Sequence, residues 1–231
     1  MILRSTGRAT VRPATVALAV ALALAVGSAL VGCAPPLGGG GAATPTPTEP
    51  PASGPASACP TRQPEPLASG EVREVAIDTS LGAIVIEIRA DLSPIAAGNF
   101  VALASCGYYD GVVFHRAATL QDGTPFVIQG GDPTGTGRGG PGYTIADEPV
   151  TAAYGRGTVA MARTAEPDSV GSQFFIVLDD AARDVLASYN TYQIIGTVTS
   201  GMEAADAIHA DADAELPTIP IAMESVTVRT P

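Results

Sequence analysis

Residues 108–132 read YYDGVVFHRAATLQDGTPFVIQGGD, and this stretch is the most informative part of the chain for its fold. It holds two short apolar runs, 112–115 and 126–129, separated by a segment rich in turn-forming residues. Short runs of β-branched and aromatic residues between turn signals are typical of strands. We therefore expect two strands, the first leading into Arg116 and the second carrying Gln129.

The same pattern continues on both sides of this stretch. Further strands are expected at 71–78, 83–88, 157–161, 174–177, 193–198 and 221–229. Residues 79–82 form a hairpin connection between the first two of these. One helix is expected to begin with Ser93 as its N-cap and Pro94 as its first residue and to end at Gly107, and a second to lie at about 202–210. Many short strands, abundant turns and few helices favour a mainly β fold, a closed antiparallel barrel.

Four motifs follow one another along the chain: FHR (114–116), FVIQGGD (126–132), GTVAMA (157–162) and GSQFFI (171–176). This set, in this order, resembles the cyclophilins, and the resemblance covers roughly residues 71–230. It implies a closed eight-stranded antiparallel barrel capped by two helices, with a peptide groove on its outer surface. It also implies peptidyl-prolyl cis-trans isomerase activity on proline-containing polypeptides.

The chemistry of that reaction explains which residue types it needs. Rotation about a peptide bond is resisted by a barrier of ~18–20 kcal/mol, because the nitrogen shares its lone pair with the carbonyl. No bond breaks, so we expect no cofactor and no metal. A donor that hydrogen-bonds the prolyl nitrogen lowers the barrier, and Arg116 matches the catalytic arginine of the family. No proton is transferred, so His115 is given no acid–base role.

The resemblance assigns nine further residues to the groove that binds the peptide: His115, Phe126, Val127, Gln129, Ala162, Arg163, Gln173, Phe175 and Tyr192. Phe126 and Phe175 match the aromatic walls of the proline pocket. Gln129 matches the residue that hydrogen-bonds the substrate backbone. Ala162 and Arg163 match the strand along which the peptide lies.

Three features depart from the better-known eukaryotic pattern. The loop at 117–125 is longer, and Tyr192 stands where a groove histidine is common. The chain has no tryptophan, whereas tight cyclosporin binders have one at the edge of the groove, so we expect weakened cyclosporin binding. The aliphatic pocket residue that precedes Tyr192 is either Leu186 or Tyr189.

Other motifs carry little weight. Residues 135–140, GTGRGG, match a dinucleotide-binding pattern, but they lead into Pro141 and not into a helix. They are expected to form a loop near the groove. Ser172 lacks the sequence context of a nucleophile. The chain has only two histidines, His115 and His209, and its cysteines are far apart, so no metal-ligand cluster is expected.

The N-terminal segment has the features of an export signal. Three arginines precede an apolar run at 15–31, which ends in LVGC at Cys33. LVGC resembles a bacterial lipobox, in which the cysteine is lipidated. We therefore expect a signal peptide at 1–32 and a protein that is lipid-anchored, through Cys33, to the outer face of the bacterial cytoplasmic membrane. An uncleaved anchor helix is the alternative, although about 17 apolar residues is short for a ~30 Å membrane core.

Residues 33–69 are expected to form a disordered linker, and residues 70–231 the cyclophilin-like domain. The linker is mostly Pro, Gly, Thr, Ser and Ala, which cannot bury enough apolar surface to offset the entropy of ordering. Two cysteines remain in the exported part, Cys59 near the end of the linker and Cys106 in the domain. Cysteine pairs outside the cytoplasm are often bonded, and a disulfide between these two would pin the linker to the domain.

Charge narrows the list of partners. The formal charge is −11, and outside the leader only 9 basic residues face 23 acidic ones, so binding to nucleic acid is not expected. All twelve basic residues are arginine, which excludes lysine-dependent Schiff-base chemistry. We expect a monomer. One alternative to an active isomerase stays open, a non-catalytic proline-peptide-binding chaperone module. A merely structural surface lipoprotein would have a degraded groove, whereas Arg116, Phe126, Gln129 and Phe175 are all present.

Overall fold

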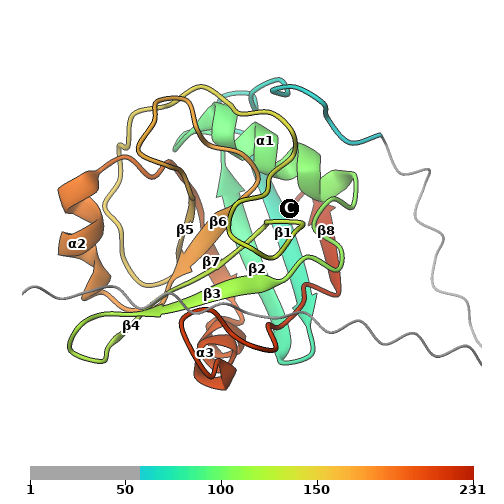
Figure 1. Cartoon of the computed structure of the whole chain (residues 1–231). Helices are drawn as coiled ribbons and strands as arrows, with labels where there is room; N and C mark the ends of the chain where they lie inside the picture. The colour runs from blue at the N-terminus through green and yellow to red at the C-terminus, as the bar shows by residue number, and fades with distance from the viewer. Residues whose placement is uncertain (1–57) are drawn as a thin grey trace, which may run out of the picture. The chain divides into compact units, whose positions relative to one another are not determined.

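The computed structural model describes residues 58–231, and Figure 1 shows them as a curled sheet with helices around it. The strands are β1 (Val72–Thr79), β2 (Gly82–Arg89), β3 (Phe114–Thr119), β4 (Pro125–Gly130), β5 (Thr158–Met161), β6 (Phe174–Val177), β7 (Ile194–Ser200) and β8 (Ser225–Arg229). The helices are α1 (Pro94–Ser105), α2 (Ala182–Tyr189) and α3 (Met202–Asp211). No helix within residues 58–231 is both long and apolar enough to cross a membrane. The expected signal peptide and Cys33 lie outside the described residues.

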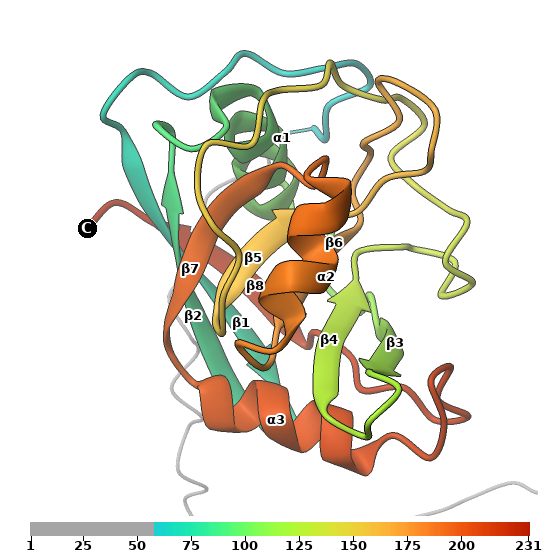
Figure 2. The same ribbon diagram turned by 90° about the vertical axis from the view of Figure 1, so that its left-hand side faces the viewer.

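All eight strands belong to one antiparallel sheet with the order β3-β4-β6-β5-β7-β2-β1-β8. The prediction of a mainly β fold with eight antiparallel strands is therefore confirmed. Helices α1 and α3 lie at opposite ends of the curled sheet, and α2 lies outside it (Figures 1 and 2).

One detail of the expected barrel differs in the structure, and another is not confirmed. Residues 58–231 contain three helices where two were expected, because residues 182–189 form the additional helix α2. The closed barrel is not confirmed, because the edge strands β3 and β8 share no ladder. Instead, the loop that precedes β8 covers the edge at β3: the Phe114 N–H donates to the Ile221 carbonyl at 2.9 Å, and the Ala117 N–H donates to the Glu215 carbonyl at 2.8 Å.

The sheet carries an apolar cluster on each face. Alternate side chains of a strand point to opposite faces, and β6 buries both sets. Phe174 and Ile176 belong to the large cluster inside the curled sheet. Phe175 and Val177 belong to a smaller cluster on the outer face, which also includes Leu186 of α2. The short helix α2 thus forms a wall over the outer face of β6.

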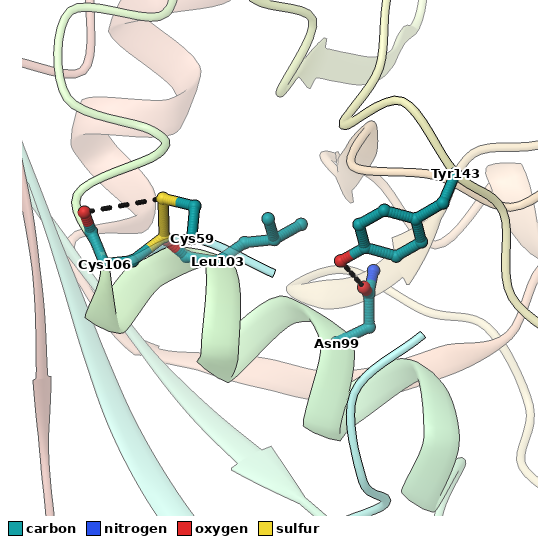
Figure 3. Close-up of a disulfide and its surroundings, with 5 residues drawn as sticks. All are labelled: Cys59, Asn99, Leu103, Cys106 and Tyr143. Carbon is teal, nitrogen blue, oxygen red and sulfur yellow. Dashed lines mark hydrogen bonds between the residues drawn. A yellow bond between two sulfur atoms is a disulfide. The ribbon is translucent and has the colours of Figure 1, made fainter. Parts of the chain in front are cut away.

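Residues 58–67, which we call the strap, lie along α1. Cys59 is disulfide-bonded to Cys106, directly after the C-terminal end of α1 (Figure 3). At the other end of the helix, the Leu67 N–H donates to the Pro94 carbonyl at 3.0 Å. Between these points the strap backbone comes so close to Gly98 that a Cβ there would lie 2.6 Å from the Glu65 carbonyl oxygen. The strap is part of the segment assigned to the linker from the sequence, and these contacts hold it against the domain.

The beginning of α1 is stabilised differently from the expectation. Ser93 occupies the N-cap position, but its side chain makes no capping hydrogen bond. The Glu148 carboxylate accepts the N–H groups of Ile95 and Ala96, each at 2.9 Å. A distant carboxylate therefore satisfies the free N–H groups of the first turn, which a side chain at the N-cap often does.

Candidate active site

A cavity of about 370 Å³ opens on the outer face of the sheet, between β3, β4 and β6 on one side and α2 on the other. It is lined by Arg116, Phe126, Val127, Gln129, Ala162, Arg163, Phe175, Val185, Leu186, Tyr189 and Tyr192. Eight of the ten residues assigned to the groove from the sequence are among them. The two exceptions are His115 and Gln173.

Strand register explains how Arg116 meets its neighbours. Arg116 of β3 pairs with Gln129 of β4, and Gln129 pairs with Phe175 of β6. The Arg116 Nη1 donates to the Gln129 Oε1 at 3.3 Å, and the Gln129 Nε2 donates to the Gln173 Oε1 at 2.9 Å. The Gln173 Nε2 then donates to the Gly139 carbonyl at 2.9 Å. A chain of hydrogen bonds thus leads from the guanidinium to the loop beyond the cavity.

The floor and walls of the cavity are apolar and aromatic. Phe175 and Val127 are almost fully buried beneath it. The rings of Phe175 and Tyr192 meet edge to face, with centroids 5.4 Å apart and an interplanar angle of 87°. The Tyr192 backbone is fixed in turn by the Tyr154 hydroxyl, which donates to the Tyr192 carbonyl at 2.9 Å. This arrangement suits a small apolar ring, which fixed aromatic surfaces hold by contact.

Leu186 and Tyr189, the two candidates for the pocket residue that precedes Tyr192, both lie on α2 and both line the cavity. Leu186 is buried against the outer apolar cluster, whereas Tyr189 is 63% exposed at the rim. Val185 also lines the cavity, and no sequence motif pointed to it.

A second cavity of about 620 Å³ adjoins the first and shares Gln129, Ala162 and Arg163 with it. Gln173 and the glycine-rich loop at 137–142 line this second cavity. The GTGRGG segment therefore forms part of a loop beside the groove and leads into no helix.

The buried carboxylate of Asp132 organises the glycine-rich loop. It accepts the N–H groups of Thr134, Thr136, Arg138 and Gly139 at 2.7–3.0 Å. Burial alone would raise the pKa of Asp132, but the backbone donors, Gly139 first among them, hold it well below its ordinary value. The loop backbone is thus wrapped around one fixed negative charge.

His115 lines neither cavity. Its side chain is buried beneath the glycine-rich loop, with Gly137 directly above the ring. Within the described residues neither ring nitrogen has a hydrogen-bond partner. Burial lowers the pKa of His115, since the charged ring is poorly solvated there. The expected place of His115 on the groove surface does not match this geometry.

The guanidinium of Arg163 is engaged in an ion pair and in hydrogen bonds to backbone carbonyls. Its Nη1 lies 2.9 Å from the Asp147 carboxylate, and its Nε and Nη2 donate to the carbonyls of Thr164 and Glu166 at 3.1 and 2.7 Å. Arg116 also has an acidic partner, Glu215, whose carboxylate lies 2.7 Å from its Nε. Glu215 lies 99 positions further along the chain in a loop without a motif, so no sequence signal identified it.

The site contains a guanidinium beside an aromatic pocket and no group of metal ligands. No set of three His, Cys, Asp or Glu side chains is placed to hold a metal ion within residues 58–231. A guanidinium beside an apolar cavity can donate hydrogen bonds to a polar group of a ligand whose apolar part lies in the cavity.

Comparison with known proteins identifies the family. Residues 74–228 match the family model described as cyclophilin type peptidyl-prolyl cis-trans isomerase/CLD. The peptidyl-prolyl cis-trans isomerase-like 1 protein of Rhizopus delemar is 47% identical over 137 residues, which are 57% of this chain and 77% of that protein. The peptidyl-prolyl cis-trans isomerase ppi1 of Schizosaccharomyces pombe is 46% identical over 133 residues, or 55% and 79% of the two chains.

A solved structure agrees with these matches. The crystal structure of a cyclophilin type peptidyl-prolyl cis-trans isomerase from Cryptosporidium parvum has a TM-score of 0.59 and 30% identity, and the match covers 69% of this chain and 99% of that one. One conclusion follows from the shared fold, the matched family model and the relatives, in which close to half of the aligned residues are identical. The chain belongs to the cyclophilin-type peptidyl-prolyl cis-trans isomerases.

Proposed function

We propose that Arg116 is the donor that hydrogen-bonds the prolyl nitrogen while the Xaa-Pro bond rotates. The observation that supports this role is the cavity that Arg116 lines together with Phe126 and Phe175. A thousandfold acceleration requires about 4 kcal/mol. A charge-assisted hydrogen bond contributes about 1.5–3 kcal/mol, and positioning of the proline ring contributes the remainder.

We propose that the substrate is an extended, proline-containing polypeptide whose proline ring enters the 370 Å³ cavity. Gln129 and the backbone at Ala162 would bind the flanking peptide, because both lie at the boundary shared by the two cavities. A second Cryptosporidium parvum structure, 31% identical and with a TM-score of 0.58, was determined in the presence of the dipeptide Ala-Pro. That relative supports proline peptides as the ligand class for this chain.

Export as a lipoprotein is the second part of the proposal. The basic and apolar leader, LVGC at Cys33 and the Pro-rich segment after it support attachment to the outer face of a bacterial membrane. The Cys59–Cys106 disulfide is in keeping with an oxidising compartment. The domain, acting as a monomer, would then assist the folding of exported proteins. The relatives named above are eukaryotic, and the family match begins only at residue 74.

Membrane fractionation tests this location. Wild-type protein expressed in a bacterium should remain with the membrane, and the Cys33→Ala variant should not become lipid-modified. A wild-type protein recovered entirely in the cytoplasm would contradict the proposal.

A non-catalytic peptide-binding module remains the second candidate, and one assay separates the two. Isomerisation of a proline-containing test peptide should be followed without a coupling protease, with the purified full chain and its Arg116→Ala variant. The variant should lose activity by about 10- to 150-fold, which corresponds to the loss of about 1.5–3 kcal/mol of transition-state stabilisation. Peptide binding with no wild-type acceleration would favour the non-catalytic module, and full activity of the variant would remove Arg116 from its proposed role.

A further inference from the structure

Glu215 holds one edge of the Arg116 guanidinium. The Nε and Nη2 of Arg116 each lie 2.7 Å from the same carboxylate oxygen, Oε1 of Glu215. On the other side, Nη1 donates to Gln129 at 3.3 Å. A guanidinium has five N–H groups. These three contacts leave one N–H on each terminal nitrogen for a ligand in the cavity.

The backbone of Glu215 is itself fixed beside the same strand. Its carbonyl accepts the N–H of Ala117, the residue after Arg116, at 2.8 Å. The turn that carries Glu215 is closed by the Asp213 carboxylate, which accepts the Thr218 N–H at 2.9 Å. These hydrogen bonds fix the backbone of Glu215 beside β3. The Glu215 side chain therefore extends to Arg116 from a fixed backbone position.

We infer that Glu215 is a positioning residue for the isomerase reaction and that it acts through Arg116. It turns the long arginine side chain so that the two remaining N–H groups face the cavity above Phe175. Without this contact the side chain would distribute over several rotamers, and binding of the substrate would have to select one of them. The inference rests on the proposed role of Arg116.

The Glu215 carboxylate has two opposing effects on the ability of Arg116 to act as a hydrogen-bond donor. It fixes the guanidinium in place, and it also offsets part of the positive charge that polarises the amide. The two side chains are 35% and 59% exposed, so water screens the charge effect. The N–H groups on Nε and Nη2 of Arg116 both donate to one oxygen of Glu215. The amide oxygen of a glutamine at this position can accept both hydrogen bonds in the same geometry. We therefore assign the larger effect to positioning.

Replacement of Glu215 by Ala and by Gln distinguishes the two effects. Glu215→Ala should lower kcat/KM about 5- to 10-fold, because the guanidinium is no longer held in one geometry. Glu215→Gln should retain activity within about twofold, because its amide oxygen replaces the carboxylate oxygen as acceptor. Glu224→Ala is the matched control: it removes the same charge from an exposed site just before β8 and should leave kcat/KM unchanged.

The double variant Arg116→Ala/Glu215→Ala provides the second readout. If Glu215 acts through Arg116, the double variant should be no less active than Arg116→Ala alone. Equal losses in Glu215→Ala and Glu215→Gln, or a gain in both, would assign the effect to charge and overturn the inference. Unchanged activity of Glu215→Ala would overturn it as well. An inactive wild type, or an active Arg116→Ala variant, would refute the proposed function instead, so the two failures are distinguishable.

Discussion

Phe174 and Phe175 are neighbours on β6, yet they belong to different parts of the molecule. Phe174 points into the curled sheet, where its ring centroid lies 5.1 Å from that of Phe100 and 5.7 Å from that of Tyr109. Phe175 points outward and forms the floor of the cavity beside Arg116. One strand of four residues therefore supplies both the interior and the proposed binding surface. Burial alone does not separate the two roles, since both rings are buried. The difference lies in what covers them, packed protein in one case and an open cavity in the other.

The largest change in free energy is expected on substitution of a residue inside the curled sheet. Phe174→Ala should lower the free energy of unfolding by about 3–5 kcal/mol, because it leaves a cavity among packed aromatic rings. The activity per folded molecule should change little. Urea unfolding and the isomerisation assay on the same sample measure both quantities. A large loss of kcat/KM in the folded fraction would break the proposed separation of the two faces.

A smaller effect on stability is expected at the loop over His115. Asp132→Asn should cost about 2 kcal/mol at pH 7, because an amide satisfies the surrounding N–H donors less well than a carboxylate. The folded-state pKa of Asp132 is lowered, so its contribution is present above the unfolded value of about 3.9 and is lost as the pH falls below it. The difference between wild type and variant in urea unfolding should therefore shrink from pH 7 to pH 3. A difference that stays constant would show that the charge has no role.

The smallest change in free energy is expected on the outer face of the sheet, where it concerns catalysis and not stability. Phe175→Ala should lower kcat/KM about tenfold, equal to about 1.4 kcal/mol in transition-state binding, because the cavity loses its floor. Phe175→Leu is a matched control that keeps the apolar volume and should lose less. If Phe175→Ala destabilised the fold as much as Phe174→Ala but left kcat/KM intact, the outer ring would be a core residue.

Most of the sheet could be predicted because alternation and turn residues are local signals. Helix α2 could not, since it has eight residues and only a few apolar positions, and it depends on packing over β6 through Leu186. The N-cap position of α1 was predicted correctly, but the group that accepts its free N–H groups was not, for a related reason. Ser93 is the residue that local preference selects, but Glu148 reaches the helix from more than fifty positions away.

Within the site, residues in contiguous motifs were the predictable ones. Arg116, Gln129 and Phe175 come together because they lie on adjacent strands in register. The pairing register of β3 shifts between Phe114 and Arg116, and His115, at this irregularity, is buried beneath a loop although it precedes the motif arginine. Glu215 meets Arg116 only after the whole sheet has formed, and no pattern of local spacing encodes such a contact.

The strap has a mechanical consequence. Cys59 is the point at which the described chain is covalently joined to the end of α1. A pulling force applied to the chain before Cys59 would pass through the sulfur–sulfur bond into the helix and on to the sheet. The hydrogen bond at Leu67 and the backbone contact at Gly98 would carry almost none of that load while the bond is intact. Reduction would transfer the whole load to those weak contacts, and the strap would peel away from α1 before any strand of the sheet was disturbed.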